Sequence, residues 1–216
     1  MKIITGIHKT RNIVMPKGIR PTQNRVRKAV FDILGDVKGL SFLELFAGSG
    51  AVGLEALSRG ASGVIFVEGN RDAQVAINSN IQALKLQNCM LMSRSAEETI
   101  PFLHKSGRKF DIIFMDPPYH KLNSLSPSTP CADIGTRRQS ELRRYPPCSG
   151  NCAGVPLSAA KKTLQILGAY DILSPNGFVI VQHFKSDNLT NESAGLHLVK
   201  KAKYGDTLLS FYQRAS

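Results

Sequence analysis

The stretch FLELFAGSGAVGLEAL, from Phe42 to Leu57, decides the fold of this chain of 216 residues. It begins as an apolar run, passes through the small residues 47–50, and resumes a helical apolar spacing at Val52, Leu54 and Leu57. This order predicts a buried strand, a tight turn and a helix. Glycines reach φ > 0 and expose bare backbone, and a helix start offers unpaired N–H groups. The stretch therefore predicts a site for a small cofactor at the turn.

Further apolar runs alternate with helical periodicity along the rest of the chain. We expect strands over 63–68, 89–93, 109–115 and 177–182, helices over 70–86, 96–104 and 161–173, and a final pair of strands over 196–203 and 207–212. Strands that are apolar throughout belong to a parallel sheet that is covered on both faces. The pattern predicts a doubly wound, Rossmann-like α/β domain over residues 37–216, mostly parallel, with a C-terminal antiparallel hairpin.

Residues 1–36 precede this domain as a small basic extension. They predict a short hairpin, with Ile3, Ile7, Ile13 and Val14 as its apolar anchors, followed by a helix over 21–34. The net charge of the chain is +12, and residues 1–31 contain eight Lys and Arg side chains but no acid. A basic arm of this kind most often meets phosphates, although many basic faces are only solvated. We therefore expect a polyanionic partner.

No run of the chain approaches the roughly 20 apolar residues of a membrane span, and the N-terminus lacks an apolar signal core. We expect a cytoplasmic monomer that needs no metal. Cys89 and His183 lie in or beside apolar strands, so we assign both to packing. Asp206, in a predicted turn, is expected to fix that turn.

Two carboxylates frame the predicted turn at the carboxyl ends of the strands, where ligands collect in open α/β sheets. Glu44 lies in the first strand, and Glu68 ends the second, where its carboxylate can accept both hydroxyls of a ribose. The same spacing would suit a dinucleotide, since Gly48, Gly50 and Gly53 form a G-x-G-x-x-G pattern. That pattern alone is weak evidence.

The tetrapeptide Asp116-Pro117-Pro118-Tyr119 distinguishes the two interpretations. It follows a buried strand, and a rigid turn there can serve only to end the strand. Its groups also suit an exocyclic amine on a planar base. The Asp116 carboxylate and a carbonyl fixed by Pro117 can accept the two amine hydrogens, and the Tyr119 ring can stack on the base. This chemistry favours an amine methyltransferase.

The motifs RPTQNRVRKAVFDIL, LELFAGSGAVGLEALSRGA, VIFVE, DPPY and KYGDTLLSFY resemble one family in particular. The chain resembles the class I S-adenosylmethionine-dependent methyltransferases, and within them the bacterial RsmD-like enzymes. These enzymes methylate the exocyclic N2 amine of one guanine in small-subunit (16S) ribosomal RNA. The resemblance covers nearly the whole chain outside residues 123–157. It implies a class I methyltransferase fold, S-adenosylmethionine as cofactor, and ribosomal RNA or the small subunit as partner.

The resemblance also implies a role for each matching position. Glu44 would approach the methionine amino group, Glu68 would bind the ribose, Ala96 would border the adenine, and Phe46, Ala47, Gly48, Ser49 and Gly50 would wrap the cofactor backbone. Residues 116–119 would hold the flipped guanine. RNA contacts are expected from Lys9, Arg11, Arg20, Thr22, Arg25 and Lys28. Glu44, where aspartate is common, and Glu97, where a short polar residue is less surprising, depart from the family pattern.

Two other functions stay open from the residues. An adenine-N6 methyltransferase acting on DNA or RNA would use DPPY equally well. A catalytically silent RNA-binding protein is the other, if residues 123–157 block the pocket. A nicotinamide-dependent oxidoreductase is a more distant alternative. Only the glycine pattern suggests it, and the sequence offers no acid for hydride transfer.

Residues 123–157 interrupt the loop after DPPY, which borders the expected substrate pocket. The segment is rich in proline and serine and has no sustained apolar period. We expect a disordered insertion, with two alternatives. One is an RNA-contacting element that uses Arg137, Arg138, Arg143 and Arg144, and the other is a small zinc site built from Cys131, Cys148, Cys152 and His120. Long loops cost little stability, so the fold should tolerate the insertion.

Overall fold

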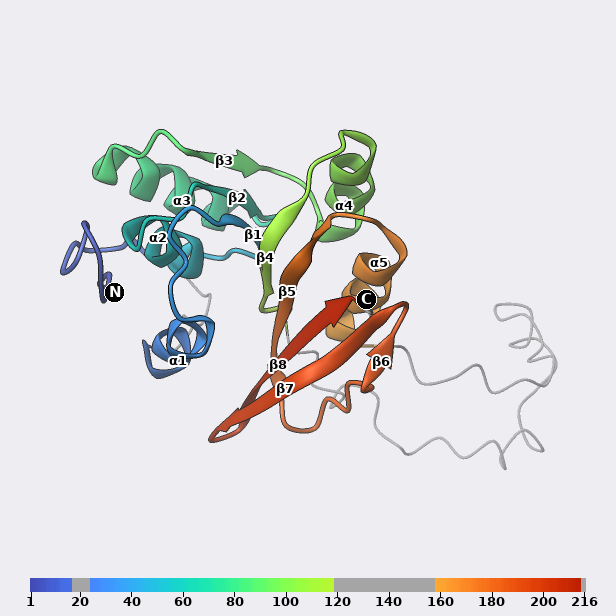
Figure 1. The fold of residues 1–216 in the computed structure, drawn as a ribbon. Helices are drawn as coiled ribbons and strands as arrows, with labels where there is room; N and C mark the ends of the chain where they lie inside the picture. The colour runs from blue at the N-terminus through green and yellow to red at the C-terminus, as the bar shows by residue number, and fades with distance from the viewer. Residues whose placement is uncertain (17–23, 119–157, 215–216) are drawn as a thin grey trace, which may run out of the picture. The chain divides into compact units, whose positions relative to one another are not determined.

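The computed structural model describes residues 1–16, 24–118 and 158–214, and the predicted insertion lies outside them. The strands are β1 (Ser41–Leu45), β2 (Gly63–Val67), β3 (Cys89–Met92), β4 (Phe110–Met115), β5 (Leu173–Phe184), β6 (Glu192–Ser193), β7 (Leu196–Tyr204) and β8 (Thr207–Arg214). The helices are α1 (Asn24–Leu34), α2 (Ala51–Ser58), α3 (Arg71–Leu84), α4 (Ala96–Lys105) and α5 (Ala159–Ala169). Figure 1 shows these elements.

All eight strands form one sheet in the order β3-β2-β1-β4-β5-β8-β7-β6. The first five strands are parallel to their neighbours, and the pairings β5–β8, β8–β7 and β7–β6 are antiparallel. The predicted mostly parallel sheet with a C-terminal antiparallel hairpin is confirmed. The carboxyl ends of the five parallel strands therefore lie at one edge of the sheet, which we call the carboxyl edge.

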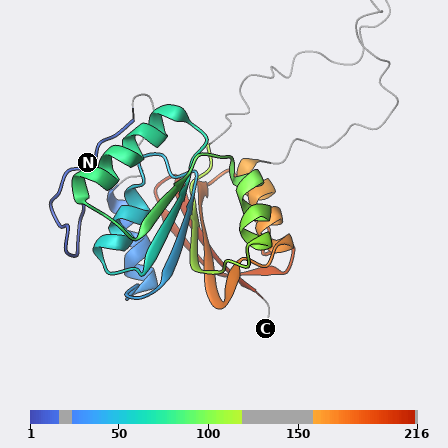
Figure 2. The ribbon, with the colours of Figure 1, turned by 90° about the horizontal axis from the view of Figure 1, so that it is seen from above.

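Helices cover both faces of the sheet, as the apolar runs predict. Figure 2 shows α1, α2 and α3 on one face and α4 and α5 on the other. Successive side chains of a strand point to opposite faces. Phe42 of β1 therefore joins the core beneath α1–α3, whereas Leu43 and Leu45 join the core beneath α4 and α5. All three side chains are completely buried, which explains why β1 is apolar at successive positions.

The end of α5 and the start of β5 differ most from the predicted boundaries. The helix expected over 161–173 ends at Ala169, and β5 begins at Leu173 instead of residue 177. The pairing of β4 with β5 is irregular between Phe110 and Ile112, so the start of β5 is bulged. An irregular start of this kind leaves no regular apolar alternation for a sequence pattern to detect. The two-residue strand β6 was likewise not expected.

The two arms of the N-terminal segment are joined by the bridge between Lys2 and Asn12 and by backbone hydrogen bonds between Ile3 and Arg11 and between Met1 and Ile13. Ile3 and Ile13 are buried in the core, so their expected role as anchors is confirmed. Ile7 and Val14 are 83 % and 52 % exposed, so their expected role as anchors is wrong. The buried Glu55 of α2 instead accepts hydrogen bonds from the amides of Ile4 and Thr5 at 2.7 and 2.9 Å.

None of the helices in the described part of the chain is long and apolar enough to cross a membrane. The largest buried side chains of these residues belong to the sheet and to the helix faces that cover it, together with Ile3 of the N-terminal segment.

Helix α2 packs against the sheet through Gly53. A methyl group added at Gly53 would lie 2.6 Å from the Phe66 ring, 2.7 Å from Glu44 Oε2 and 2.7 Å from Val64 Cγ1. The helix can approach β1 and β2 this closely because the residue has no side chain.

We expect Gly53→Ala to lower the free energy of unfolding by about 1–3 kcal/mol, because an overpacked core forces side chains and backbone to shift. Gly69→Ala is the matched control, since nothing lies within 4 Å of an added methyl there. Urea denaturation of both variants measures the difference. Equal stability of the two variants would contradict the close packing of α2.

Candidate functional site at the carboxyl edge of the sheet

The turn between β1 and α2 presents bare backbone at the carboxyl edge. Phe46, Gly48 and Gly50 have φ values of 56°, 57° and 72°. Gly50 is also the N-cap of α2 and provides no side-chain cap. A left-handed conformation is uncommon for a bulky residue, and strain of this kind clusters at binding sites. The turn thus has the geometry that the glycine pattern predicts.

Glu44 lies beneath this turn and is only 3 % exposed. Its carboxylate accepts hydrogen bonds from the amides of Gly53 at 2.7 Å and Val52 at 3.3 Å, at the start of α2. Burial raises the pKa of Glu44 to about 8, while the two amide donors and the nearby Arg27 act in the opposite direction. Both side-chain oxygens of Glu44 are therefore hydrogen-bonded to the first turn of α2. Its approach to a methionine amino group stays a prediction.

Glu68 follows β2 and joins the turn to the start of α3. Its Oε2 accepts from the amide of Gly48 at 2.7 Å, and its Oε1 accepts from the amide of Asn70, the N-cap of α3, at 2.8 Å. Each carboxylate oxygen has a second lone pair. The half-buried Glu68 can therefore hold the turn and still accept hydroxyl groups of a ligand.

The segment after β3 borders the same edge through its backbone. Ser95 caps α4 in a reciprocal pair of hydrogen bonds with Glu98, and Ala96 is buried. Glu97, which departs from the family pattern, forms an ion pair with Lys162 of α5 at 2.9 Å. Its longer side chain thus faces α5. The contact of Ala96 with an adenine stays a prediction.

Asp116 follows β4, next to the turn. Because Leu45 pairs with Met115 in the parallel register, Phe46 and Asp116 are the next positions on two adjacent strands. Pro117 is buried and Pro118 is exposed, while Tyr119 lies outside the described residues. The structure therefore brings the predicted base-binding motif and the predicted cofactor turn to the same point of the sheet.

Gln182, near the end of β5, is a residue that the sequence analysis did not single out. Its Nε2 donates a hydrogen bond to Asp116 Oδ2 at 2.8 Å, and the residue is only 6 % exposed. The one available signal was a polar residue ending the apolar run GFVIVQ. Recognising its partner requires the register of β4 and β5, in which Met115 pairs with Val181.

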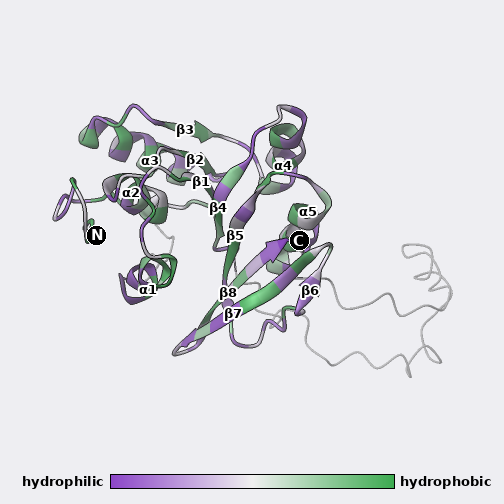
Figure 3. Cartoon of the chain, in the orientation of Figure 1, coloured by the Kyte–Doolittle hydropathy of each residue, from purple (hydrophilic) through white to green (hydrophobic). Residues whose placement is uncertain are grey.

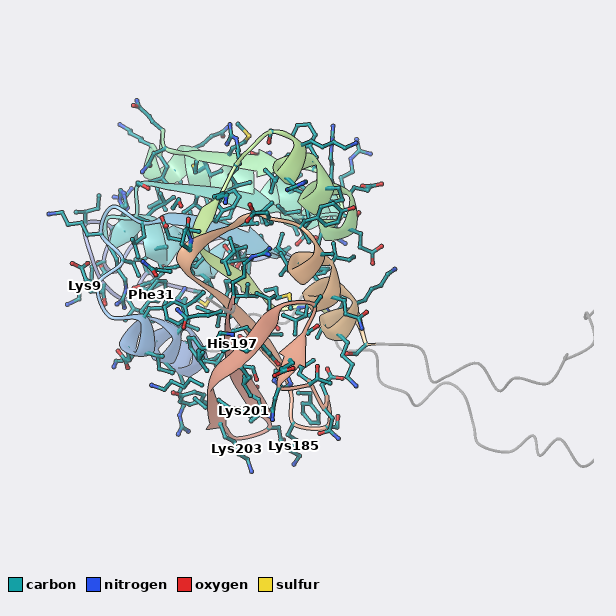
Figure 4. All side chains as sticks on the ribbon, turned by 45° about the vertical axis from the view of Figure 1, so that its right-hand side comes forward. Lys9, Phe31, Lys185, His197, Lys201 and Lys203 are labelled. Atoms are coloured by element: carbon teal, nitrogen blue, oxygen red, sulfur yellow. The ribbon has the colours of Figure 1, made fainter. Side chains whose placement is uncertain are left out.

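The predicted RNA-binding residues separate into two groups. Arg25 and Lys28 are exposed on α1, and the Arg25 guanidinium lies 6.0 Å from the ring centre of Tyr204. Lys28 also forms an ion pair with Asp32 at 2.7 Å. Arg11 donates to the carbonyl of Ala83, at the end of α3 and hence near the amino ends of the strands. Figure 4 shows Lys9 far from Lys185, Lys201 and Lys203.

Two of the predicted residues, Arg20 and Thr22, lie outside the described residues. Arg27, part of the basic arm, is completely buried and donates to the carbonyl of Ala51 at 3.5 Å and to Asn24 Oδ1 at 3.1 Å. It supports α1 and is not available to a partner.

His183 is completely buried and lies 2.9 Å from Ser210 Oγ through Nε2, and Cys89 is half-buried beside the core. Burial lowers the pKa of His183. The assignment of both residues to packing agrees with these positions. A surface hollow of about 450 Å³ lies at the amino ends of the strands, and no predicted site residue lines it.

The comparison with known protein families gives one match. The model of the family described as conserved hypothetical protein 95 matches residues 1–130 of the chain. This match includes the basic extension, the turn and the DPP motif. The methyltransferase resemblance of the motifs is confirmed at the level of the family.

Named relatives and a solved structure agree with this match. The chain is 28 % identical to the Bacillus subtilis protein named "Putative rRNA methyltransferase YlbH", over 99 % of both chains. It is 37 % identical to ribosomal RNA small subunit methyltransferase D of Escherichia coli, over 56 % of this chain and 61 % of that protein. The aligned part thus spans less than two thirds of the E. coli protein.

Among solved structures, the protein titled "Putative methyltransferase yhhF from Escherichia coli" matches with a TM-score of 0.73 and 26 % identity, over 99 % of this chain and 97 % of that one. The fold is therefore that of class I methyltransferases. On the family match, the chain belongs to the family described as conserved hypothetical protein 95, the RsmD-like methyltransferases that its motifs resemble.

Proposed function

We propose that this protein transfers a methyl group from S-adenosylmethionine to the exocyclic N2 amine of a guanine in small-subunit (16S) ribosomal RNA. The observation that carries the proposal is the adjacency of the β1–α2 turn and Asp116 on neighbouring strands of the carboxyl edge. The names of the relatives support ribosomal RNA as the substrate class. The choice of guanine N2 rests on the resemblance of the motifs.

The residues at the turn suit this cofactor. Bare backbone at Gly48 and Gly50 leaves room for a ligand to lie against the chain. Glu68 has lone pairs left for the two ribose hydroxyls, and its position is already fixed by Gly48 and Asn70. Bound S-adenosylmethionine would supply a methyl group that its sulfonium makes reactive toward a nucleophile.

Asp116 would hold the nucleophile. The lone pair of a guanine amine is delocalised into the ring, so the amine is a poor nucleophile until its N–H groups are engaged. Hydrogen bonds from the amine to Asp116 and to a carbonyl held by Pro117 favour the charge that builds on nitrogen. The methylated nitrogen is strongly acidic, so positioning is the main requirement and no strong base is needed.

The exposed side of α1 would contribute to RNA binding through Arg25 and Lys28. Of these, Arg25 is the stronger candidate, because Asp32 already compensates the charge of Lys28. Lys9 and Arg11 would contact a part of the RNA farther from the reacting base.

Transfer of labelled methyl from S-adenosylmethionine tests the reaction. The acceptors are small ribosomal subunits, or their RNA, that lack the modification, with DNA of matched length as the comparison. We expect label in RNA as N2-methylguanine after digestion to nucleosides. Label in N6-methyladenine would replace the proposed substrate with the adenine alternative, and cofactor binding without transfer to any acceptor would support the silent RNA-binding protein.

Two variants separate the roles of Asp116 and Glu68. We expect Asp116→Ala to lower the transfer rate by about 100-fold or more while cofactor affinity stays unchanged, because a preorganised hydrogen-bond partner of the reacting group is lost. We expect Glu68→Ala to weaken cofactor affinity by about tenfold or more, because hydrogen bonds to a charged group are lost.

Calorimetric titration with S-adenosylhomocysteine and single-turnover transfer at saturating cofactor measure the two effects. A large loss of cofactor affinity in Asp116→Ala would show that Asp116 belongs to the cofactor site. Normal affinity in Glu68→Ala would remove Glu68 from the ribose.

A further inference from the structure

Strand β7 carries a cluster of lysines near the carboxyl edge that the sequence analysis did not assign. Lys200, Lys201 and Lys203 are all exposed, and the structure shows no ion pair between them and the described carboxylates. Figure 4 shows Lys201, Lys203 and the neighbouring Lys185 at the same end of the domain. Lys185 differs from the others because it is paired with Asp206 at 2.6 Å.

The register of the hairpin places two of these lysines on the same face. Val199 is an extra residue in β7, because Leu198 pairs with Tyr212 and Lys200 already pairs with Phe211. After this bulge the alternation is regular, so Lys201 and Lys203 point to one face and Lys200 to the other. Residues two apart in a strand are about 6.8 Å apart. Lys201 and Lys203 therefore present two neighbouring charges on one face.

The same register gives their distance from the proposed reaction site. Asp116 lies beside Gln182, Gln182 pairs with Leu209, and Leu209 pairs with Ala202, the residue between the two lysines. Three strand spacings of about 4.8 Å place this position about 14 Å across the sheet from Asp116. A long lysine side chain reaches several ångströms from there. Phosphates next to a base held at Asp116 would lie within this range.

The other face of β7, which carries Lys200 and Tyr204, adjoins α1. Tyr204, the last residue of β7, lies beneath the Arg25 guanidinium. Figure 3 shows hydrophilic residues at the tip that joins β7 and β8, beyond the hydrophobic interior of the sheet. Arg25 is an expected RNA contact, so positive charge lies on both faces of this end of the hairpin, with Lys200 on the face of Tyr204 and Lys201 and Lys203 on the other.

We propose that Lys201 and Lys203 form a phosphate-binding surface for the RNA strand on either side of the target base. The proposal rests on the proposed function for its substrate. Lysine at an edge strand also discourages pairing with another chain, and β6 covers β7 only at Leu196 and His197. The experiment must therefore distinguish two roles of these lysines, namely RNA binding and protection of the edge strand β7 from pairing with another chain.

The test is the salt dependence of binding to small-subunit ribosomal RNA by the full chain. For the double variant Lys201→Gln with Lys203→Gln, we expect binding to weaken and the slope of log K against log salt to fall by about 2, one for each lost phosphate contact. The KM for RNA should rise, while kcat at saturating RNA and cofactor affinity stay unchanged.

The matched control is Lys105→Gln with Arg108→Gln. It removes the same charge from exposed positions between α4 and β4, near the amino ends of the strands. We expect its salt slope to equal that of the unmodified protein. An unchanged slope in the β7 variant, or self-association of that variant with normal RNA binding, would overturn the proposal. If the β7 variant shows a reduced slope but the unmodified protein transfers no methyl group, the proposed function is overturned and the phosphate-binding surface is supported.

A second, independent observation concerns the side chain that holds Asp116. Gln182 Oε1 is buried and has no hydrogen-bond partner in the described part of the chain, although Nε2 donates to Asp116. A buried acceptor without a partner destabilises the fold. An apolar residue of the same size would avoid that cost. The stability of the fold therefore does not account for an amide side chain at position 182, whereas its hydrogen bond to Asp116 does.

We infer that Gln182 is a positioning residue that orients the Asp116 carboxylate toward the amine, an inference that rests on the proposed function of Asp116. Gln182 would hold Oδ2 of the carboxylate and thereby fix its orientation. The contribution of Gln182 would then appear in the rate of transfer and not in binding.

Gln182→Met keeps the length of the side chain and removes the donor. We expect kcat to fall by about tenfold or more, with unchanged KM values for cofactor and RNA and no loss of thermal stability. In an Asp116→Asn background the same substitution should have little further effect, because the residue acts through Asp116. Equal kcat for Gln182→Met and the unmodified protein, or an effect that is independent of Asp116, would overturn the assignment. Absence of transfer by the unmodified protein would instead overturn the proposed function.

Discussion

The position of the turn between β1 and α2 depends on the buried side chain of Glu44. It accepts hydrogen bonds from the backbone amides of Val52 and Gly53. These amides have no partner within α2 because they belong to its first turn. The same approach requires Gly53 to lack a side chain, since an added methyl would contact Glu44 itself. A buried acid, whose pKa burial raises to about 8, thus holds the start of α2 against β1. The left-handed turn between them follows from this constraint.

A second constraint ties the basic extension to the same turn. Asn80 of α3 donates to the carbonyl of Ser49 in the turn and to the carbonyl of Val14, both at 3.1 Å, and accepts from the amide of Val14 at 2.7 Å. Glu55 holds the preceding residues against α2. The extension is thus attached to the helices on either side of the turn, and the proposed RNA-binding and cofactor-binding parts share a common support.

The parts of the structure that could be predicted from the sequence are those that depend on local chemistry. The turn, the parallel strands and the position of Glu68 follow from glycine spacing and apolar runs. Gln182 could not be assigned, because its importance arises from the register of two strands far apart in sequence. Ile7 and Val14 were misjudged for a related reason, since Glu55 and Asn80 hold that segment through its backbone. Arg11 and Arg25 were grouped because both are positively charged. The structure separates them, because Arg11 contacts the end of α3 at Ala83, whereas Arg25 lies on α1 above Tyr204.

Three acids lie at the carboxyl edge, and each is held by neutral N–H groups. Glu44 accepts hydrogen bonds from the amides at the start of α2, Glu68 from the amides of the turn and of the α3 N-cap, and Asp116 from the Gln182 amide. Each acid thus has its own neutral N–H donors. Neutral donors hold a carboxylate in place without cancelling its charge. A lysine or arginine would instead compete with the positive groups of a ligand for the same carboxylate. In the proposed function, these acids would face the cofactor and the reacting amine, whereas the exposed cations Arg25, Lys201 and Lys203 would face the phosphate backbone.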